Sequence, residues 1–254
     1  MGVLKVNEQL FPGKTVLIKG ESLRILNERS RRVGDLISIR DKRGRDFRGR
    51  IVSFAQDHSE TFIFESLELP VEPVIEIHLI QALPKKERLE WIIQKTTELG
   101  VSSILPCESD HSITLEQRNS AQKKSHRWQA IATRAALQCR RARVPFIYPT
   151  LPFCDALEIG YGSDLCLLLW EKEFSTSMKR VLAALKGTVR NLTLAVGPEG
   201  GFSGQEVERA HERGFMSVGL GPRILRTETA AIAALTILQY ELGDLGGKTD
   251  RRKA

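Results

Sequence analysis

The chain has no run of about eighteen apolar residues, which is the length that a membrane-spanning helix needs. Its first residues, Met1–Lys5, contain no apolar stretch with a cleavage site, so we predict no signal peptide. The composition is 41% hydrophobic and 27% charged over 254 residues. These features predict a soluble globular protein with one large or two modest domains.

Cysteine and histidine are also scarce, with four and five residues and no C-x-x-C or H-E-x-x-H spacing. The cysteines are scattered along the chain at Cys107, Cys139, Cys154 and Cys166. We therefore expect reduced thiols in a cytoplasmic protein, with no disulfide framework and no metal site.

Acidic residues are fewer than basic ones, since the chain has 31 Asp and Glu but 38 Lys and Arg, which gives a net charge of +7. The basic residues gather in two clusters. The first contains Arg29, Arg31, Arg32, Arg40, Lys42, Arg43, Arg45, Arg48 and Arg50. The second contains Lys123, Lys124, Arg127, Arg134, Arg140, Arg141 and Arg143. Excess charge can serve solubility alone, but this clustering favours a polyanionic partner such as RNA.

The first seventy residues have the pattern of a small β-barrel. Apolar residues alternate in four short segments, residues 14–19, 36–40, 47–54 and 61–69. Turn residues separate them, and we expect no helix between them. Pro70 and Pro73 punctuate the end of this region, so we place a domain boundary between residues 72 and 73.

From residue 73 to residue 254 the pattern alternates between strands and helices. Strands are expected at residues 74–83, 101–106, 165–170, 192–196 and 216–220. Helices are expected at residues 84–99, 120–140, 177–185, 203 onward and 227–242. We expect Trp128 and Cys139 in the core, a capping box joining Ser203 and Glu206, and a solvated tail from Gly246. The alternation predicts an α/β fold with a parallel sheet and helices on both faces.

Two loops in this second part carry the strongest functional signal. Residues 197–203 read G-P-E-G-G-F-S, and residues 220–230 read L-G-P-R-I-L-R-T-E-T-A. Each follows an apolar strand and precedes a helix, so backbone groups at neighbouring strand ends can form a pocket for a polar ligand. The alternative is a pair of tight structural turns, with Glu199 as a partner of the helix dipole and Arg223 and Arg226 as surface arginines.

Both strings resemble those of the RsmE family, bacterial methyltransferases that act on 16S ribosomal RNA. The resemblance continues upstream in the Q-K-T-T-E-L-G-V of residues 94–101, in Arg127-Trp128 and in the Q-C-R-R-A-R-V-P of residues 138–145, and it covers residues 75 to 243. It implies an N-terminal PUA-like β-barrel (residues 1–72) and a SPOUT domain (residues 73–254) with a trefoil knot. It also implies S-adenosylmethionine (SAM) as the cofactor, a homodimer, and methylation of uridine N3 near the decoding centre of the 30S subunit.

We expect site residues of three kinds, the first two from the resemblance and the chemistry of methyl transfer and the third from the clustered charge. The implied SAM site contains Leu169, Trp170, Val196, Gly197, Pro198, Glu199, Gly200, Gly201, Leu220, Gly221, Arg223, Ile224, Leu225, Arg226 and Thr229. The implied catalytic residues are Arg226, Glu199 and Thr227. The residues expected to bind RNA are Arg29, Arg31, Arg32, Arg43, Arg45, Arg48, Lys85, Lys86, Arg140, Arg141 and Arg143.

Two other functions stay open on the sequence. One is a SPOUT methyltransferase with another target atom, such as a ribose 2′-OH. The other is a non-catalytic RNA-binding assembly factor, because Met1–Leu10 lacks the basic-aromatic stretch with which family members usually begin.

Overall fold

The computed structural model describes residues 4–28, 31–67, 72–85, 88–117, 127–185 and 188–246. The chain forms two compact units. The first unit comprises Met1–Glu72 and Ala136–Val144, and the second comprises Pro73–Ala135 and Pro145–Ala254. The chain thus leaves the first unit at residue 72 and returns to it for one short segment, which the sequence pattern did not indicate.

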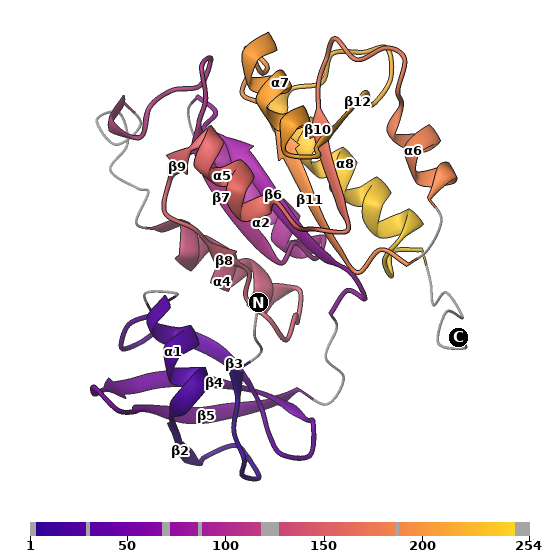
Figure 1. The fold of residues 1–254 in the computed structure, drawn as a ribbon. Helices are drawn as coiled ribbons and strands as arrows, with labels where there is room; N and C mark the ends of the chain where they lie inside the picture. The colour runs from indigo at the N-terminus through magenta and orange to yellow at the C-terminus, as the bar shows by residue number, and fades with distance from the viewer. Residues whose placement is uncertain are drawn as a thin grey trace. The chain divides into compact units, whose positions relative to one another are not determined.

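The first unit is built on a curled five-stranded sheet (Figure 1). Its strands are β1 (Leu4–Lys5), β2 (Thr15–Ile18), β3 (Leu36–Arg40), β4 (Asp46–Phe54) and β5 (Ser59–Leu67). The order is β1-β3-β4-β5-β2, and all pairs except β1 with β3 are antiparallel. Alternate residues of each strand, such as Ile37, Ile39, Ile51 and Ile63, form one core.

The expectation of strands without a helix between them is wrong, because α1 (Gly20–Glu28) separates β2 from β3. Leu23, Ile25 and Leu26 of this helix are buried. Their spacing places them on one side of a helix, and that side packs into the core of the sheet. Gly20 indicated a turn, and it does turn the chain with a φ of +60°, but the turn leads directly into the helix.

The second unit contains a parallel sheet of seven strands. These are β6 (Glu76–Ala82), β7 (Ser103–Glu108), β8 (Phe146–Ile147), β9 (Leu151–Pro152), β10 (Leu165–Leu169), β11 (Asn191–Val196) and β12 (Met216–Val218). The order is β12-β10-β11-β6-β7-β8, with β9 also pairing with β7. The chain moves from β10 to β11 in one direction and then back across β10 to β12, so the strand order reverses there.

Helices cover both faces of this sheet, as the alternating pattern predicts. They are α2 (Arg88–Glu98), α4 (Trp128–Gln138), α5 (Phe153–Gly160), α6 (Met178–Ala184), α7 (Gly204–Glu212) and α8 (Thr227–Glu241). Helices α5 and α7 share a core with Ile80 and Ala195. Helix α8 packs on β11 and on α2. The face is set by strand alternation, because neighbouring residues of a strand point to opposite sides.

Several local expectations can be compared with these elements. The capping box of Ser203 and Glu206 is confirmed, and Trp128 is buried, whereas Cys139 is only half-buried. Helix α5 and the short strands β1, β8 and β9 were not predicted. In the described residues α2 begins at Arg88 rather than at Pro84, and the expected helix start at Ser120, together with Lys123, Lys124 and most of the expected tail, lies outside them.

Candidate active site

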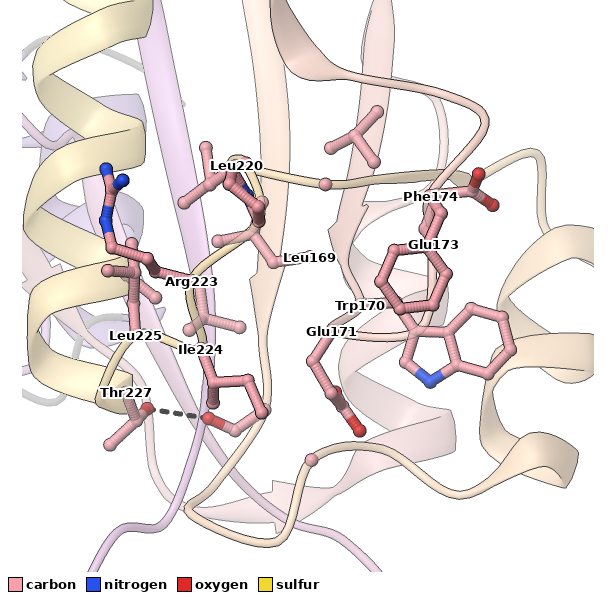
Figure 2. Close-up of a pocket in the computed structure, with 18 of the residues that line it drawn as sticks. Leu169, Trp170, Glu171, Glu173, Phe174, Leu220, Arg223, Ile224, Leu225 and Thr227 are labelled. Atoms are coloured by element: carbon pink, nitrogen blue, oxygen red, sulfur yellow. Dashed lines mark hydrogen bonds between the residues drawn. The ribbon is translucent and has the colours of Figure 1, made fainter.

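A cavity of about 300 Å³ opens at the carboxyl ends of β10, β11 and β12 (Figure 2). This is where the strand order reverses, which is the usual ligand position in an open parallel sheet. The volume lies at the lower end of small-molecule sites. Its lining consists of Leu169, Trp170, Glu171, Glu173, Phe174, Val196, Gly197, Pro198, Gly201, Val218, Gly219, Leu220, Gly221, Pro222, Arg223, Ile224, Leu225, Thr227 and Ala230.

The β12–α8 loop, residues 219–226, forms one wall and leaves most of its backbone donors free. Within the described chain, no backbone N–H of Leu220, Gly221 or residues 223–226 donates a hydrogen bond to another protein group. Because these residues border or adjoin the cavity, the loop offers six N–H groups to a polar ligand. Arg226 is the N-cap of α8, and its side chain makes no capping hydrogen bond. The positive end of the helix dipole therefore lies next to the cavity, because α8 begins here.

The β11–α7 loop forms a second wall and is fixed by the cap of α7. The Ser203 hydroxyl accepts a hydrogen bond from the Glu206 N–H, and the Glu206 carboxylate accepts from the Ser203 and Asp110 N–H groups at 2.9 Å each. Gly201 has a φ of +69°, which favours glycine. A Cβ at Gly201 would lie 2.6 Å from the carboxylate oxygens of Glu171. Glu171 belongs to the loop between β10 and α6, so that loop and the β11–α7 loop approach each other closely at the cavity.

A buried polar network joins the two walls at the base of the cavity. Thr227 Oγ1 donates to the Gly197 carbonyl at 2.6 Å, the contact drawn as a dashed line in Figure 2, and accepts from Gln81 Nε2 at 3.0 Å. Gln81 is fully buried at the end of β6, and its Nε2 also donates to the Ala82 carbonyl at 3.0 Å. The Thr227 hydroxyl is therefore committed to holding α8 against β11.

The β10–α6 loop, residues 170–177, forms the third wall. In Figure 2, Trp170, Glu171 and Phe174 lie across the cavity from Arg223, Ile224 and Leu225. The loop is tied to β12, because the Gly219 N–H donates to the Thr176 carbonyl at 2.9 Å. The approach is close enough that a Cβ at Gly219 would lie 2.5 Å from the Glu173 carbonyl oxygen.

The acidic loop residue Glu173 organises its own loop. Its carboxylate accepts hydrogen bonds from the Ser175 hydroxyl at 2.5 Å and from the Thr176 N–H at 2.8 Å. These hydrogen bonds lower the pKa of Glu173. At the rim, Phe174 and Ile224 are 87% and 85% exposed, so two apolar side chains are available to cover a bound ligand.

Glu199 lies outside the cavity and joins a different set of groups. Its carboxylate accepts from Arg88 Nη1 at 2.6 Å and from the Lys85 N–H at 3.0 Å. Arg88 also lies 3.8 Å from Glu228 of α8. Glu199 thus fastens the β6–α2 loop to the β11–α7 loop. In contrast, the side chains of Arg223 and Arg226 are exposed and have no hydrogen-bonding or ionic partner among the described residues.

Comparison with known proteins gives this site its context. Residues 70–239 match a family model described as an RNA methyltransferase domain. The ribosomal RNA small subunit methyltransferase E of Bacillus subtilis is 34% identical over 246 residues, which cover 94% of this chain and 95% of that protein. The chain belongs to the RsmE family of RNA methyltransferases.

Two solved structures are similar to this chain over nearly its whole length. The ribosomal RNA small subunit methyltransferase E of Neisseria gonorrhoeae, bound to SAM, is 31% identical with a TM-score of 0.66, covering 96% of this chain and 99% of that one. A Legionella pneumophila methyltransferase in complex with SAM is 29% identical with a TM-score of 0.67, covering 96% and 100%.

Most residues that the RsmE resemblance assigned to the cofactor border the cavity. They are Leu169, Trp170, Val196, Gly197, Pro198, Gly201, Leu220, Gly221, Arg223, Ile224 and Leu225. Four assigned residues do not line it, namely Glu199, Gly200, Arg226 and Thr229. Five lining residues outside the two loop motifs had no assignment, namely Glu171, Glu173, Phe174, Val218 and Gly219. Their signal was only their position, directly after β10 and at the end of β12.

The basic residues expected to bind RNA differ in how far they are exposed. Arg32, Arg43, Lys85 and Arg140 are exposed. Arg45 is exposed but its guanidinium is hydrogen-bonded to the buried Asp41 carboxylate at 2.8 Å. Arg143 is half-buried, and the Arg31 side chain is only 5% exposed. Arg29 and Lys86 lie outside the described residues.

For Arg48 and Arg141 the expectation of RNA contact is wrong, because both are 4% exposed and engaged inside the first unit. Arg48 donates to the Ala136 carbonyl at 3.3 Å and to Glu65 at 3.1 Å. Arg141 pairs with Glu72 at 2.8 Å. These guanidinium groups hold the Ala136–Val144 segment on the first unit.

The described chain contains no disulfide and no cluster of possible metal ligands. All four cysteines are free thiols, and burial raises the pKa of the Cys107 thiol, which favours its protonated form. No group of three or more His, Cys, Asp or Glu in the described part could hold a metal ion. No described helix is long and apolar enough to cross a membrane.

Proposed function

We propose that this chain transfers the methyl group of SAM to N3 of a uridine in 16S ribosomal RNA, near the decoding centre of the 30S subunit, in the cytoplasm. The observation that carries the proposal is the cavity bounded by two glycine-rich loops, in a chain whose relatives from Neisseria gonorrhoeae and Legionella pneumophila bind SAM. Family membership supports the reaction class.

The residues of the cavity fit SAM chemically. When bound, SAM supplies a methyl group that is already electrophilic because it sits on a sulfonium. The free N–H groups of residues 220–226 bind its polar atoms. Leu169, Val196 and Leu225 border the same space with apolar side chains and exclude water from the adenosine.

Arg226 is the proposed catalytic residue. N3 of uridine is a poor nucleophile until its proton leaves, and the charge then spreads to O2 and O4. The Arg226 guanidinium is exposed at the start of α8, beside the cavity loop, and is free to stabilise that charge. Removal of one such donor typically slows a reaction about 100- to 1000-fold.

Thr227 and Glu199 receive positioning roles in this mechanism. The Thr227 hydroxyl is committed to Gly197 and Gln81, and the Glu199 carboxylate to Arg88 and Lys85. Both therefore act by holding the loops in place. No histidine is among the described residues that border the cavity, so the described part of the chain places no imidazole there as a general base.

RNA binding is assigned mainly to the first unit, which we propose to be a PUA-like domain. It contains 16 Lys and Arg against 11 Asp and Glu, and so carries +5 of the net charge of +7. Arg32, Arg43 and Arg140 are exposed on it. Binding through such groups weakens steeply as salt rises, because phosphate contacts release counterions.

The second unit is proposed to be a SPOUT domain with a trefoil knot that acts as a homodimer. The return of the chain from β11 across β10 to β12 is compatible with a threaded segment at the cavity. The packed helices α2 and α8 expose large apolar side chains, since Trp91, Ile237 and Tyr240 are 58%, 36% and 64% exposed. An exposed apolar surface of this kind suits a second copy of the chain.

The test is incubation with methyl-labelled SAM and 30S subunits from a strain that lacks the enzyme, followed by primer extension. We expect incorporation of label and one reverse-transcriptase stop, because N3 methylation blocks Watson–Crick pairing. Label without a stop would indicate a ribose 2′-OH target, and binding without label would indicate an assembly factor. Arg226→Ala should slow transfer at least about 100-fold with SAM affinity within about twofold, whereas Arg190→Ala, next to the opposite end of β11, should transfer normally.

A further inference from the structure

The outward face of the first-unit sheet exposes aromatic side chains. On β5, Thr61 and Ile63 are fully buried, whereas Phe62 and Phe64 are 40% and 38% exposed. This alternation is that of a strand with one face in the core. Phenylalanine belongs among the usually buried residues, so two neighbours on the solvent side of one strand call for a functional explanation.

An unpaired guanidinium lies beside these rings. Phe62 is the cross-strand partner of Arg50 on β4 and of Thr15 on β2. Direct cross-strand partners have Cβ atoms about 4.5–5.5 Å apart. The Arg50 side chain is exposed and has no hydrogen bond or ion pair with any residue that the structure describes. We call the following set the outer aromatic face: Leu17, Arg50, Val52, Phe62 and Phe64.

The rest of this outward face is already covered from within the first unit. The Ser38 hydroxyl of β3 donates to the Ala142 carbonyl, and Arg48 of β4 donates to the Ala136 carbonyl. The Ala136–Val144 segment therefore lies over the part of the sheet next to Arg48. The outer aromatic face, two residues further along β4, is a part that the described residues leave open.

We propose that the outer aromatic face binds single-stranded RNA, with bases stacked on Phe62 and Phe64 and a phosphate held by Arg50. The inference rests on the proposed function, because it names the surface that holds RNA away from the cofactor cavity. Aromatic rings on interior strands of a sheet are a general means of stacking unpaired bases. The net charge of +5 on this unit favours a polyanion over a protein surface.

The test measures RNA binding without catalysis, by fluorescence anisotropy with a labelled twelve-residue oligouridine and the full-length protein. Phe62→Ala/Phe64→Ala should weaken binding at least about tenfold, because each stacked base contributes substantially to affinity. Binding of a duplex RNA of the same length should change less than about twofold, because its bases are not free to stack. Arg50→Gln should lower the dependence of log affinity on log salt by about one.

Two control variants separate stacking from folding. Phe62→Tyr/Phe64→Tyr keeps both rings and should bind oligouridine within about threefold of the unchanged protein. Tyr161→Ala removes an aromatic ring that is 64% exposed in the second unit, and it should leave binding unchanged. Thermal unfolding of each variant shows whether the fold is kept, and a loss of RNA affinity in both the Ala and the Tyr pairs would overturn the stacking explanation.

Two further results would overturn the proposal. One is unchanged oligouridine affinity in Phe62→Ala/Phe64→Ala. The other is an oligomeric state of the Phe62→Ala/Phe64→Ala variant that differs from that of the unchanged protein in light scattering. That result would make the outer aromatic face a contact between protein chains. Methyl transfer to 30S subunits is measured separately, so absent transfer with normal oligouridine binding refutes the proposed reaction and leaves this surface standing.

Discussion

Replacement of Thr227 by Val removes a single hydroxyl from the base of the cavity and keeps the branched shape. The residue is 4% exposed, and its hydroxyl donates to the Gly197 carbonyl at 2.6 Å and accepts from Gln81 at 3.0 Å. Without it, the half-buried Gly197 carbonyl loses a donor and the buried Gln81 amide loses an acceptor, and an unsatisfied buried polar group costs about 1–3 kcal/mol. Gln81 keeps its bond to the Ala82 carbonyl, so we expect a total loss within that range in urea unfolding.

The same substitution should weaken the cofactor site. Gly197 and the start of α8 both border the cavity, so a relaxed Gly197 carbonyl displaces two of its walls. If about 1.4 kcal/mol of the loss appears in binding, SAM affinity in calorimetry falls about tenfold. Thr227→Ser keeps the hydroxyl and is the matched control. Equal stability and equal SAM affinity in the Val and Ser variants would refute the reasoning.

Three further substitutions test other parts of the account. Gly219→Ala should lower SAM affinity more than tenfold in calorimetry, because its Cβ would lie 2.5 Å from a facing carbonyl oxygen, whereas Gly204→Ala, with no atom within 4 Å, should have no effect. Glu199→Ala removes a partly exposed ion pair and should cost about 1 kcal/mol or less in unfolding with SAM affinity within about threefold; a hundredfold loss would place Glu199 on the cofactor. Arg48→Ala should lower the free energy of unfolding by about 2–4 kcal/mol in urea, because it strips buried carbonyls of their donor, and Arg43→Ala by no more than about 0.5 kcal/mol; equal effects would contradict the burial of Arg48.

The elements that sequence predicts well are those with local signals. The spacing of Ser203 and Glu206 predicts the cap of α7. The glycine-rich loops are predicted because each directly follows an apolar strand. The β10–α6 wall has no such signal in residues 170–174. It is held at the cavity by backbone hydrogen bonds to β12 and Gly219, such as that from the Gly219 N–H to the Thr176 carbonyl, which join segments that are distant in sequence.

The basic residues illustrate the same limit. Arg48 and Arg50 are both arginines and lie on the same side of β4, yet Arg48 is buried and Arg50 is exposed. The difference arises from the Ala136–Val144 segment, whose Ala136 carbonyl accepts from Arg48 across 88 residues of chain. Charge clustering therefore does not show which charges are exposed, because a segment distant in sequence can fold back over some of them.

The most direct test of the account is a crystal structure of the protein with SAM bound. The account predicts the adenosine in the cavity at the ends of β10, β11 and β12, with its polar atoms hydrogen-bonded to the N–H groups of residues 220–226 and with Arg226 free to face the transferable methyl. SAM bound outside this cavity, or held chiefly by the Glu199 carboxylate, would contradict it.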